Sequence, residues 1–393
     1  MELLSLYRAI GVDSCPPEME AQLSAFTETS IPSCDIHVID ALQAEWNMFG
    51  QFHETVKAVA QEINADPYHN AWIGAAATFA KEHSRKEICQ IPIPRKSGRL
   101  ISSLLPLYII IALLPSGIAK YRSLGFPDPE IQVLMHQVLN SLKISHNQFD
   151  MLGINRSYFS WLLLFAKAEI FQISGFQFEI KKLPEAAVYI KNRQTGEIVP
   201  LIFNRTIHRS GLHILGSVGF EDSDGAIVTE FREDSENFWG YPCYNCKFHT
   251  ELTQFPKSQW EAYLRPGQDV LGFHISCHAD ISPASLQNAF AQAKTILQQR
   301  YPDHKSKAFY CSSWLLDPLL GDITGPNSKI SMFQNRFLRY PTKCDGNEIF
   351  QYVFKRRPDD LTQLPEDTTL RRGLKKCYLS GQYNHSHAGI ILE

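Results

Sequence analysis

The sequence predicts a helical N-terminal domain followed by an α/β domain, with the change near Gly175. Before this point, apolar residues recur at helical spacing and no long stretch alternates with the period of a strand. After it, residues 176–180 alternate apolar and polar side chains, and residues 269–316 contain two apolar strands around one amphipathic helix. We therefore place the domains at residues 1–175 and 176–393.

Composition limits the class of protein. The chain has 393 residues, which suits two domains, and 44% of them are hydrophobic, which suffices for sizeable cores. The net charge is −3 and no long basic run occurs, so nucleic acid is not expected as a main partner. The nine cysteines form no disulfide framework and no signal peptide is recognisable, so we expect a cytoplasmic protein.

Residues 1–175 are expected to be mainly helical. The most apolar segment, residues 104–114, is far shorter than the ~20 residues that a membrane helix needs, so it is predicted to be a buried core helix and not a membrane span. A polar connection is expected at residues 95–103 before it. The other expected helices lie near residues 19–26, 52–63, 70–83, 127–142 and 157–171.

In the second half, residues 187–191 and 199–203 flank a glycine-bearing loop, which predicts a β-hairpin. A helix is expected from Asp367 or Thr368 to near Gly381, and its basic residues indicate a solvated face. The remaining expectations are short strands at 226–231, 248–252, 348–355 and 388–392, and a short helix at 256–264.

The centre of the second half is a predicted βαβ unit. Residues 269–275 indicate a buried strand, Ser282 caps the helix that follows, and residues 307–316 indicate a second strand. Such strands are parallel, and their connection is right-handed. Ligands bind at the carboxyl ends of such strands, which here are residues 275–278 and 312–314.

Metal binding is one alternative that the sequence leaves open. Cys243, Cys246 and His249 are zinc-ligand types at near-zinc spacing, but a second pair at standard spacing is missing. Residues 277–278, a cysteine and a histidine, are candidates for completing the set. The simpler interpretation is a cysteine-containing turn and strand, and a redox role is weaker because no helix start follows.

Motifs for other chemistry are missing. There is no G-x-S-x-G nucleophile elbow, no P-loop and no G-x-G-x-x-G fingerprint. An anion site can be argued at the helix start, residues 282–285, from its free N–H groups and the helix dipole, although every helix has such an end.

Several polar residues near the strand ends allow both a structural and a functional interpretation. His274, inside an apolar strand, is either a hydrogen-bonded core residue or a catalyst. Asp317 is either a cap of the next turn or a site residue, and Ser312 either packs closely or faces a ligand. Arg336, among phenylalanines, needs an acidic partner or an anion if it is buried.

Seven segments together resemble a bacterial two-domain acyltransferase-like family. VLGFHI at 270–275 resembles its VL-x-H-I-P strand, and CSSWLLDP at 311–318 resembles its C-H-S-W-L-L-D-P segment. The other matching segments are 176–179, 285–286, 327–330, 333–337 and 364–372. The family pairs a helical N-terminal acyltransferase domain with a C-terminal domain like that of the GCN5-related N-acetyltransferases (GNAT-like). The resemblance therefore implies a GNAT-like mixed sheet in residues 176–393.

The resemblance also implies a site. In GNAT-like folds a central strand parts from its neighbour, acyl-CoA enters the V-shaped gap, and an amine attacks the thioester. The implied CoA contacts are Phe273, Ile275, Ser276, Ser282, Ala284 and Ser285. The implied catalytic candidates are His274, Ser312 and Asp317. The implied substrate contacts are Ser313, Trp314, Gln334 and Arg336, and no metal is expected.

The sequence departs from the family at several positions. The Q/R-x-x-G-x-G/A pyrophosphate loop is not present between residues 276 and 285, and Ser312 stands where the family has histidine. Ser276 replaces a proline and Gly175 an arginine. We predict an acyl-CoA-dependent N-acyltransferase acting on an amine of a small molecule or peptide. The alternatives are a non-catalytic binding or scaffold protein on a degenerate acyltransferase fold, and a zinc-dependent protein.

Overall fold

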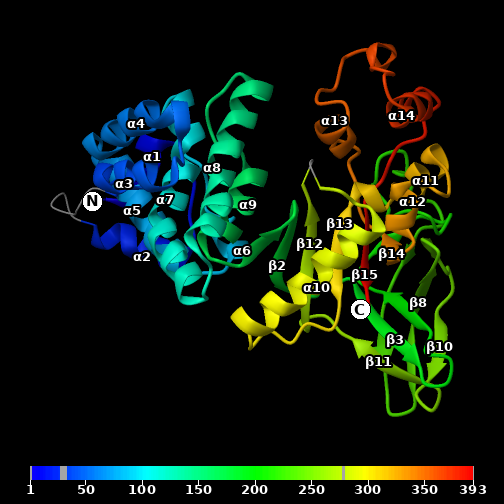
Figure 1. Cartoon of the computed structure of the whole chain (residues 1–393). Helices are drawn as coiled ribbons and strands as arrows, with labels where there is room; N and C mark the ends of the chain where they lie inside the picture. Colours follow the sequence, from blue (N-terminus) through cyan, green and yellow to red (C-terminus); the bar gives the residue numbers. More distant parts are fainter. Residues whose placement is uncertain (1, 27–32, 277–278, 393) are drawn as a thin grey trace. The chain divides into compact units, whose positions relative to one another are not determined.

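A computed structural model describes residues 2–26, 33–276 and 279–392. The chain divides into two compact units, Met1–Phe171 and Gln172–Glu393, and each is described by itself (Figure 1). The first unit is helical, and the second contains mixed β-sheets with helices. The predicted order of a helical half followed by a mixed-sheet half is confirmed.

Caps in the sequence explain where several helices of the first unit begin. The side chain of Asp66 accepts hydrogen bonds from the backbone of α5, whose first residue is Pro67, and Ser84 forms a capping box with Glu87. The helices are α1 (Leu3–Ile10), α2 (Pro17–Ala25), α3 (Ile36–Trp46), α4 (His53–Ala65), α5 (Pro67–Glu82), α6 (Arg85–Ile88), α7 (Arg99–Ser123), α8 (Asp128–Phe149) and α9 (Arg156–Ala166), with a 3-10 turn η1 (Gly50–Phe52).

Helix α7 is the core helix of this unit and is longer than predicted. It begins at Arg99, inside the expected polar connection, and runs through both Pro106 and Pro115. Burial of its apolar side chains outweighs the local cost of the two prolines. In the described part of the chain, one helix, α7, is long enough and apolar enough to cross a membrane. However, 67% of its most apolar window is buried inside the protein. That burial agrees with the predicted core helix.

Helices α7 and α9 touch at a glycine. A Cβ atom built on Gly117 would lie 2.1 Å from the backbone oxygen of Ala166, a distance that real Cβ atoms essentially never show. The neighbour is backbone, so relief requires one helix to move. Gly74, in α5, offers a contrast, because its added Cβ would meet Ser33 at 3.6 Å, an ordinary contact.

We expect Gly117→Ala to lower the free energy of unfolding by about 1–3 kcal/mol, since it separates two packed helices. The matched variant Gly74→Ala should be neutral or stabilising by up to about 1 kcal/mol, because alanine has the higher helix propensity. Urea unfolding of both full-length variants checks this difference. Equal stabilities would show that the α7–α9 contact is not as close as the structure has it.

The chain enters its second unit through a short hairpin. Strand β1 (Ile170–Ile173) lies within residues where the sequence predicts helix and no strand. It follows Ala168, whose left-handed φ of 51° ends the helical path, and four residues are too few to show alternation. Ser174 and Gly175, with φ of 50° and 85°, make the turn to β2 (Phe176–Lys182).

The central sheet has the strand order β1-β2-β12-β13-β15-β14. The strands not yet placed are β12 (Asp269–Ile275), β13 (Phe309–Ser313), β14 (Leu338–Pro341) and β15 (His387–Ile391). Strands β12 and β13 are parallel and α10 (Pro283–Arg300) joins them, so the predicted βαβ unit is observed. The final strand predicted at 388–392 is β15.

A second sheet has the order β10-β8-β4-β3-β11, and β7 and β9 also pair with β8. The predicted hairpin is β3–β4. These strands are β3 (Ala187–Asn192), β4 (Ile198–Ile202), β7 (Arg232–Glu233), β8 (Asn237–Tyr244), β9 (Lys247–Phe248), β10 (Thr253–Pro256) and β11 (Trp260–Leu264). A separate pair joins β5 (Thr206–Ile207) to β6 (Ile227–Val228).

Two predicted elements are of the wrong type. Residues 256–264 form no helix, because Trp260–Leu264 is strand β11 paired with β3. The predicted strand at 348–355 begins as a helix, α13 (Glu348–Tyr352), whose residues Ile349 and Phe350 pack into a buried cluster with Val353 and Phe354. That spacing is helical, and tertiary packing outweighs the strand propensity of the same side chains.

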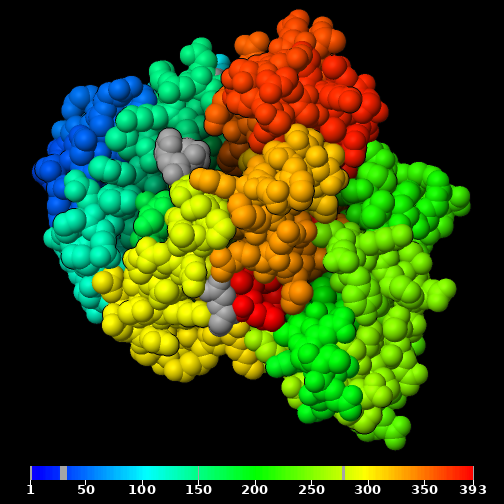
Figure 2. All heavy atoms as spheres, turned by 45° about the vertical axis from the view of Figure 1, so that its right-hand side comes forward, coloured from blue at the N-terminus to red at the C-terminus, as the bar shows by residue number. Residues whose placement is uncertain are grey.

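The remaining helices of the second unit follow β13. They are η2 (Trp314–Leu316), α11 (Pro318–Thr324), α12 (Lys329–Gln334), η3 (Leu361–Gln363) and α14 (Thr369–Leu379). Helix α14 and its neighbouring loops, coloured orange-red to red, lie at the surface in Figure 2. Two of its basic residues pair with acids, Lys375 with Glu366 at 2.6 Å and Arg371 with Asp367 at 2.9 Å.

The two faces of the central sheet differ in chemistry. Phe273 of β12 and Phe309 of β13 pack against Phe290 of α10, with ring centroids 5.0 and 4.3 Å apart. Alternation along β12 therefore turns Gly272 and His274 to the opposite face. The polar residues of the central strands gather on this second face.

Candidate active site

The parallel strands of the central sheet part from each other. Among the described residues, the ladder between β12 and β13 joins Leu271 to Phe309 and Gly272 to Tyr310 and extends no further. Each strand nevertheless stays paired with its outer neighbour, β12 with β2 as far as Ile275 and β13 with β15 as far as Ser313. We call the diverging ends, Phe273–Ile275 and Cys311–Ser313, the fork. Strand edges of this kind can hydrogen-bond an extended ligand.

An ionisable pair stands at the fork. His274 Nε2 lies 2.9 Å from Oε2 of Glu179, which comes from the neighbouring strand β2. The Glu179 side chain is only 3% exposed, whereas that of His274 is 33% exposed. A buried carboxylate needs hydrogen-bond donors, so the geometry favours the tautomer in which His274 donates from Nε2. The lone pair for accepting a proton is then on Nδ1.

A third charged group shares the same carboxylate oxygen. Lys181 Nζ lies 3.1 Å from Glu179 Oε2 and 5.3 Å from the ring centroid of Tyr310 on β13. Glu179 is therefore bound by two cationic or potentially cationic side chains, which compensates its burial. Burial raises the pKa of Tyr310 to about 12, so its hydroxyl stays protonated and neutral.

Gly272 makes room for these side chains. It lies opposite Glu179 in the β2–β12 ladder. An added Cβ would lie 2.8 Å from Cδ of Lys181 and 2.9 Å from Cβ of Glu179. Any larger residue at 272 would therefore displace one of these two side chains from the face that carries His274.

Among the described residues, the start of α10, the predicted anion site, carries no side-chain cap from Ser282. The Ser282 hydroxyl instead donates to Asp280 at 2.7 Å, and Asp280 pairs with Lys329 at 2.8 Å. Ala284 and Ser285 form the first turn. Lys329 and the Ser282 hydroxyl lower the pKa of Asp280 to about 2. Residues 277–278, another part of the predicted ligand edge, lie outside the described residues.

Two residues predicted for the site, Asp317 and Gln334, make hydrogen bonds within the protein in the segments that follow β13. Asp317 accepts hydrogen bonds from the backbone N–H of Leu319 and of His385 and from the Asn384 side chain. Burial raises the pKa of Asp317 to about 6. Gln334 is buried and donates to the backbone oxygen of Asp317 at 2.7 Å. These contacts hold the segment after the fork in place.

The other predicted residues divide between the fork and its surroundings. Ser312 is exposed on β13 and follows Tyr310 on the same face. Ser313 accepts a hydrogen bond from the backbone of Leu315, as the cap of η2. Trp314 stacks on Tyr352 at 6.3 Å between ring centroids. The Arg336 guanidinium lies 5.4 Å from the ring centroid of Phe290.

Sequence reasoning missed Glu179, Lys181 and Gly272. The signal was present, because the alternation in residues 176–182 places Glu179 and Lys181 on one face of a strand next to the predicted one. This alternation could not show that β2 is the strand beside β12, because His274 and Glu179 are 95 residues apart in the chain.

The zinc hypothesis finds no support. Within residues 2–26, 33–276 and 279–392, no three metal-ligating side chains gather closely enough to hold an ion. Cys243 is buried and its Sγ contacts the backbone oxygen of Arg339 at 3.7 Å, whereas His249 is exposed.

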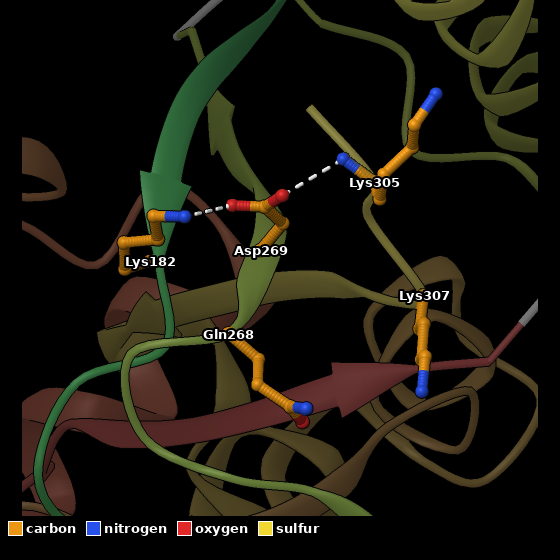
Figure 3. Close-up of a pocket in the computed structure, with 5 residues that line it drawn as sticks. All are labelled: Lys182, Gln268, Asp269, Lys305 and Lys307. Carbon is orange, nitrogen blue, oxygen red and sulfur yellow. Dashed lines mark hydrogen bonds and ion pairs between the residues drawn. The ribbon is translucent and has the colours of Figure 1, made fainter. Parts of the chain in front are cut away.

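A pocket of about 240 Å³ lies at the other end of β12 (Figure 3). Its lining residues are Lys182, Gln268, Asp269, Lys305 and Lys307. Asp269 is held by the Lys182 ammonium at 2.5 Å and by the backbone N–H of Lys305 at 2.8 Å. The pocket is at the amino end of the strand, whereas ligands of parallel units bind at the carboxyl end, so the fork is the better candidate for a ligand site.

A mixed sheet whose central parallel strands part after two residue pairs, with a helix following the first of them, defines a GNAT-like acyltransferase fold. Residues 170–391 match the GNAT-like C-terminal domain family, and the chain belongs to that family. The family resemblance predicted from the short segments is therefore confirmed. No curated protein matches the sequence.

Solved structures share the fold over the whole chain. One, an acyltransferase in complex with decanoyl-CoA, is 16% identical, with a TM-score of 0.63 and coverage of 100% of both chains. Another, an acyltransferase in complex with decanoyl-CoA and teicoplanin, is 15% identical, with a TM-score of 0.61 and coverage of 100% of this chain and 99% of that chain. A mutant acyltransferase in complex with octanoyl-CoA is 14% identical, with the same TM-score and coverage. The chain thus has the fold of acyl-CoA-binding acyltransferases.

Proposed function

We propose that this protein transfers an acyl group from acyl-CoA to an amine of a small molecule or peptide. The observation that carries the proposal is the pairing of His274 with the buried Glu179 at the fork. A histidine oriented by a buried carboxylate is a general base in reach of a ligand bound between the strands. The solved acyltransferases of the same fold, which bind decanoyl-CoA or octanoyl-CoA, support a medium-chain acyl donor.

The donor would lie along the fork. Its pantetheine arm would hydrogen-bond to the backbone of Phe273, Ile275 and Ser276, as an extended peptide does at a sheet edge. Its pyrophosphate would lie at the first turn of α10, at Ser282, Ala284 and Ser285, where N–H groups and the helix dipole favour an anion. Asp280 is close to this position, and its pairing with Lys329 offsets the negative charge.

The reaction has a simple balance of bonds and protons. The amine nitrogen attacks the thioester carbonyl, and His274 takes the proton that the nitrogen loses. As the tetrahedral intermediate collapses, the C–N bond is kept, the C–S bond breaks, and the CoA thiolate takes up the proton that His274 holds, which returns the imidazole to its neutral form. Glu179 orients the imidazole and stabilises the imidazolium that forms. Ser312, exposed at the other side of the fork, would contact the reacting groups, and Asp317 and Gln334 hold the segment beyond it.

Calorimetric titration of the full-length protein with acetyl-, octanoyl- and decanoyl-CoA and with free CoA tests the donor. We expect saturable binding of at least one acyl-CoA, with the longer chains bound more tightly because they bury more apolar surface. Release of free thiol in the presence of a panel of amines then tests transfer. Absence of binding to every CoA compound would overturn the proposal. Binding without thiol release would instead favour the non-catalytic alternative, which Ser312 and the missing glycine loop suggest.

A further inference from the structure

Three side chains of the first unit form a Ser-His-Asp arrangement. The hydroxyl oxygen of Ser97 lies 2.5 Å from Nε2 of His69, and Nδ1 of the same ring lies 3.0 Å from Oδ2 of Asp66. Ser97 and His69 are buried, at 6% and 8% exposed, whereas the Asp66 side chain is 43% exposed. This order of contacts is the one that activates the nucleophile of serine hydrolases.

The carboxylate of Asp66 selects the tautomer of His69. A carboxylate only accepts hydrogen bonds, so the neutral imidazole donates to it from Nδ1 and has its lone pair on Nε2. Nε2 therefore accepts the hydrogen bond that the Ser97 hydroxyl donates. In this form the ring can take the proton of the serine, which a general base beside a nucleophile must do.

The helices of the first unit fix these three residues. Asp66 is the N-cap of α5 and accepts hydrogen bonds from two backbone N–H groups of its first turn, which also contains His69. Ser97 comes two residues before α7, which packs against α5 (Figure 1). The two residues before Ser97 both donate their N–H groups to the backbone oxygen of Ile10, at 3.0 Å. The hydroxyl is thus held at the imidazole by ordered backbone on both sides.

The start of α7 offers hydrogen-bond donors for an oxyanion. Ser97 is followed by Gly98, the N-cap, with a φ of 74°, and then by the helix. The first N–H groups of a helix have no intrahelical partner, and in the described part of the chain no side chain caps α7. The first turn of α7 has no acidic residue, so the helix dipole favours a negative charge there. A Cβ atom built on Gly98 would meet nothing within 4 Å, which leaves space beside the serine.

We propose that the first unit contains a second active site, a serine hydrolase centre for carboxylic esters or thioesters. Ser97 is its nucleophile, His69 is its general base, and Asp66 is the positioning residue that orients the imidazole. This activity goes beyond the proposed function, because it uses no residue of the fork and takes water in place of an amine.

The reaction has two halves. Ser97 Oγ attacks the carbonyl carbon and passes its proton to His69 Nε2; the bond to the leaving alcohol or thiol then breaks, and the leaving group takes that proton. The acyl group remains as an ester of Ser97. Water attacks this ester and gives a proton to His69, the bond between Oγ and the acyl carbon breaks, and Oγ takes the proton back as the carboxylic acid leaves.

Covalent labelling of the full-length protein tests the nucleophile. We expect a fluorophosphonate probe and phenylmethanesulfonyl fluoride to modify Ser97, as located by mass spectrometry of peptides. Ser97→Ala should lose the label and lower the hydrolysis of p-nitrophenyl acetate at least about 10²-fold. Ser141→Ala is the matched control and should equal the wild type, because buried Ser141 donates to the backbone oxygen of Gln137 instead of a histidine. Failure of both reagents to label Ser97 would overturn the inference.

Asp66→Asn tests the positioning residue, because asparagine caps a helix as well as aspartate does. The amide can donate to Nδ1, so we expect the His69 proton to move to Nε2. The ¹⁵N shifts of the imidazole, assigned by their loss in His69→Gln, report this change, and the rate of labelling should fall at least about tenfold. An unchanged tautomer with an unchanged rate would contradict the role of Asp66.

Thiol release from octanoyl-CoA separates this site from the fork. Release that needs no amine and is lost in Ser97→Ala is hydrolysis by the serine, whereas amine-dependent release that survives in Ser97→Ala is the proposed acyl transfer. Circular dichroism shows whether each variant keeps the fold. If Ser97→Ala does not fold, Ser97→Cys replaces it and should react with iodoacetamide faster than Ser141→Cys, since a histidine lowers the pKa of a neighbouring thiol. Equal reactivity of these two cysteines would also count against the site.

Discussion

Replacing His274 with glutamine is expected to lower kcat for acyl transfer by about 10²–10⁴-fold, the usual contribution of a positioned general base. The variant keeps a polar side chain that can still contact Glu179, so the sheet should remain intact. Binding of acyl-CoA should change little, because the proposed donor contacts are backbone groups of β12 and α10. The loss is therefore expected in kcat and kcat/KM together, which marks an interaction made in the transition state.

The variant Glu179→Gln distinguishes the role of the carboxylate from that of the histidine. We expect a smaller loss of kcat, because the amide can still orient the imidazole but no longer stabilises its positive charge. The double variant should be no slower than His274→Gln alone, since both residues act through one proton transfer. His249→Gln, at an exposed histidine of the same unit, is the control and should retain full activity. Full activity in His274→Gln would show that the base lies elsewhere.

Local patterns predicted the frame of this site well. The strand at 269–275, the helix that Ser282 opens and the second strand, predicted at 307–316 and observed at 309–313, each depend on a short run of residues whose pattern is plain in the sequence. The two wrong assignments, β11 and α13, fall where five-residue elements owe their form to neighbours far along the chain. Short segments of this kind hold too few periods to decide between helix and strand.

The composition of the site was harder to predict for a different reason. His274 was found because it interrupts an apolar strand, but its meaning depends on Glu179 across the sheet. Asp317 and Gln334 looked equally suitable, and the structure shows both making hydrogen bonds within the fold. A polar residue near a strand end is the same signal in both cases. Which of these polar residues holds the fold together depends on its tertiary contacts, and those require the structure.

A cluster of buried histidines is expected to make the stability of the second unit depend on pH. The rings of His213 and His385 lie 4.2 Å apart, and His213 stacks on Phe220 at 3.8 Å. His387 is 2% exposed and lies opposite Ser313 in the β13–β15 ladder, so it supports one arm of the fork. Burial, together with the neighbouring Arg339 and the other histidines, lowers the pKa of His387 to about 3. Burial also lowers the pKa of His213 to about 3.

The sign of the effect follows from proton binding. A histidine with a folded-state pKa near 3 and an unfolded value near 6.5 binds a proton in the unfolded state first. Stability is therefore lost as the pH falls below about 6.5, by about 1.4 kcal/mol per pH unit for each such histidine. Asp317 and Glu348 act in the opposite sense, because burial raises the pKa of both, Asp317 to about 6. Their contribution to stability grows as the pH falls through the same range.

Since these contributions oppose each other, the difference between a variant and the wild type is the informative quantity. We expect His387→Leu to remove about 2 kcal/mol of the stability loss between pH 6.5 and pH 5, and His213→Phe, which keeps the ring stacked on Phe220, to act in the same direction. Urea unfolding of the full chain at several pH values measures both, with His249→Gln as the control that should match the wild type. Parallel pH dependences in His387→Leu and the wild type would contradict the prediction. A flatter dependence would show that neutral histidines secure β15 against β13, and with it the arm of the fork that carries Ser312.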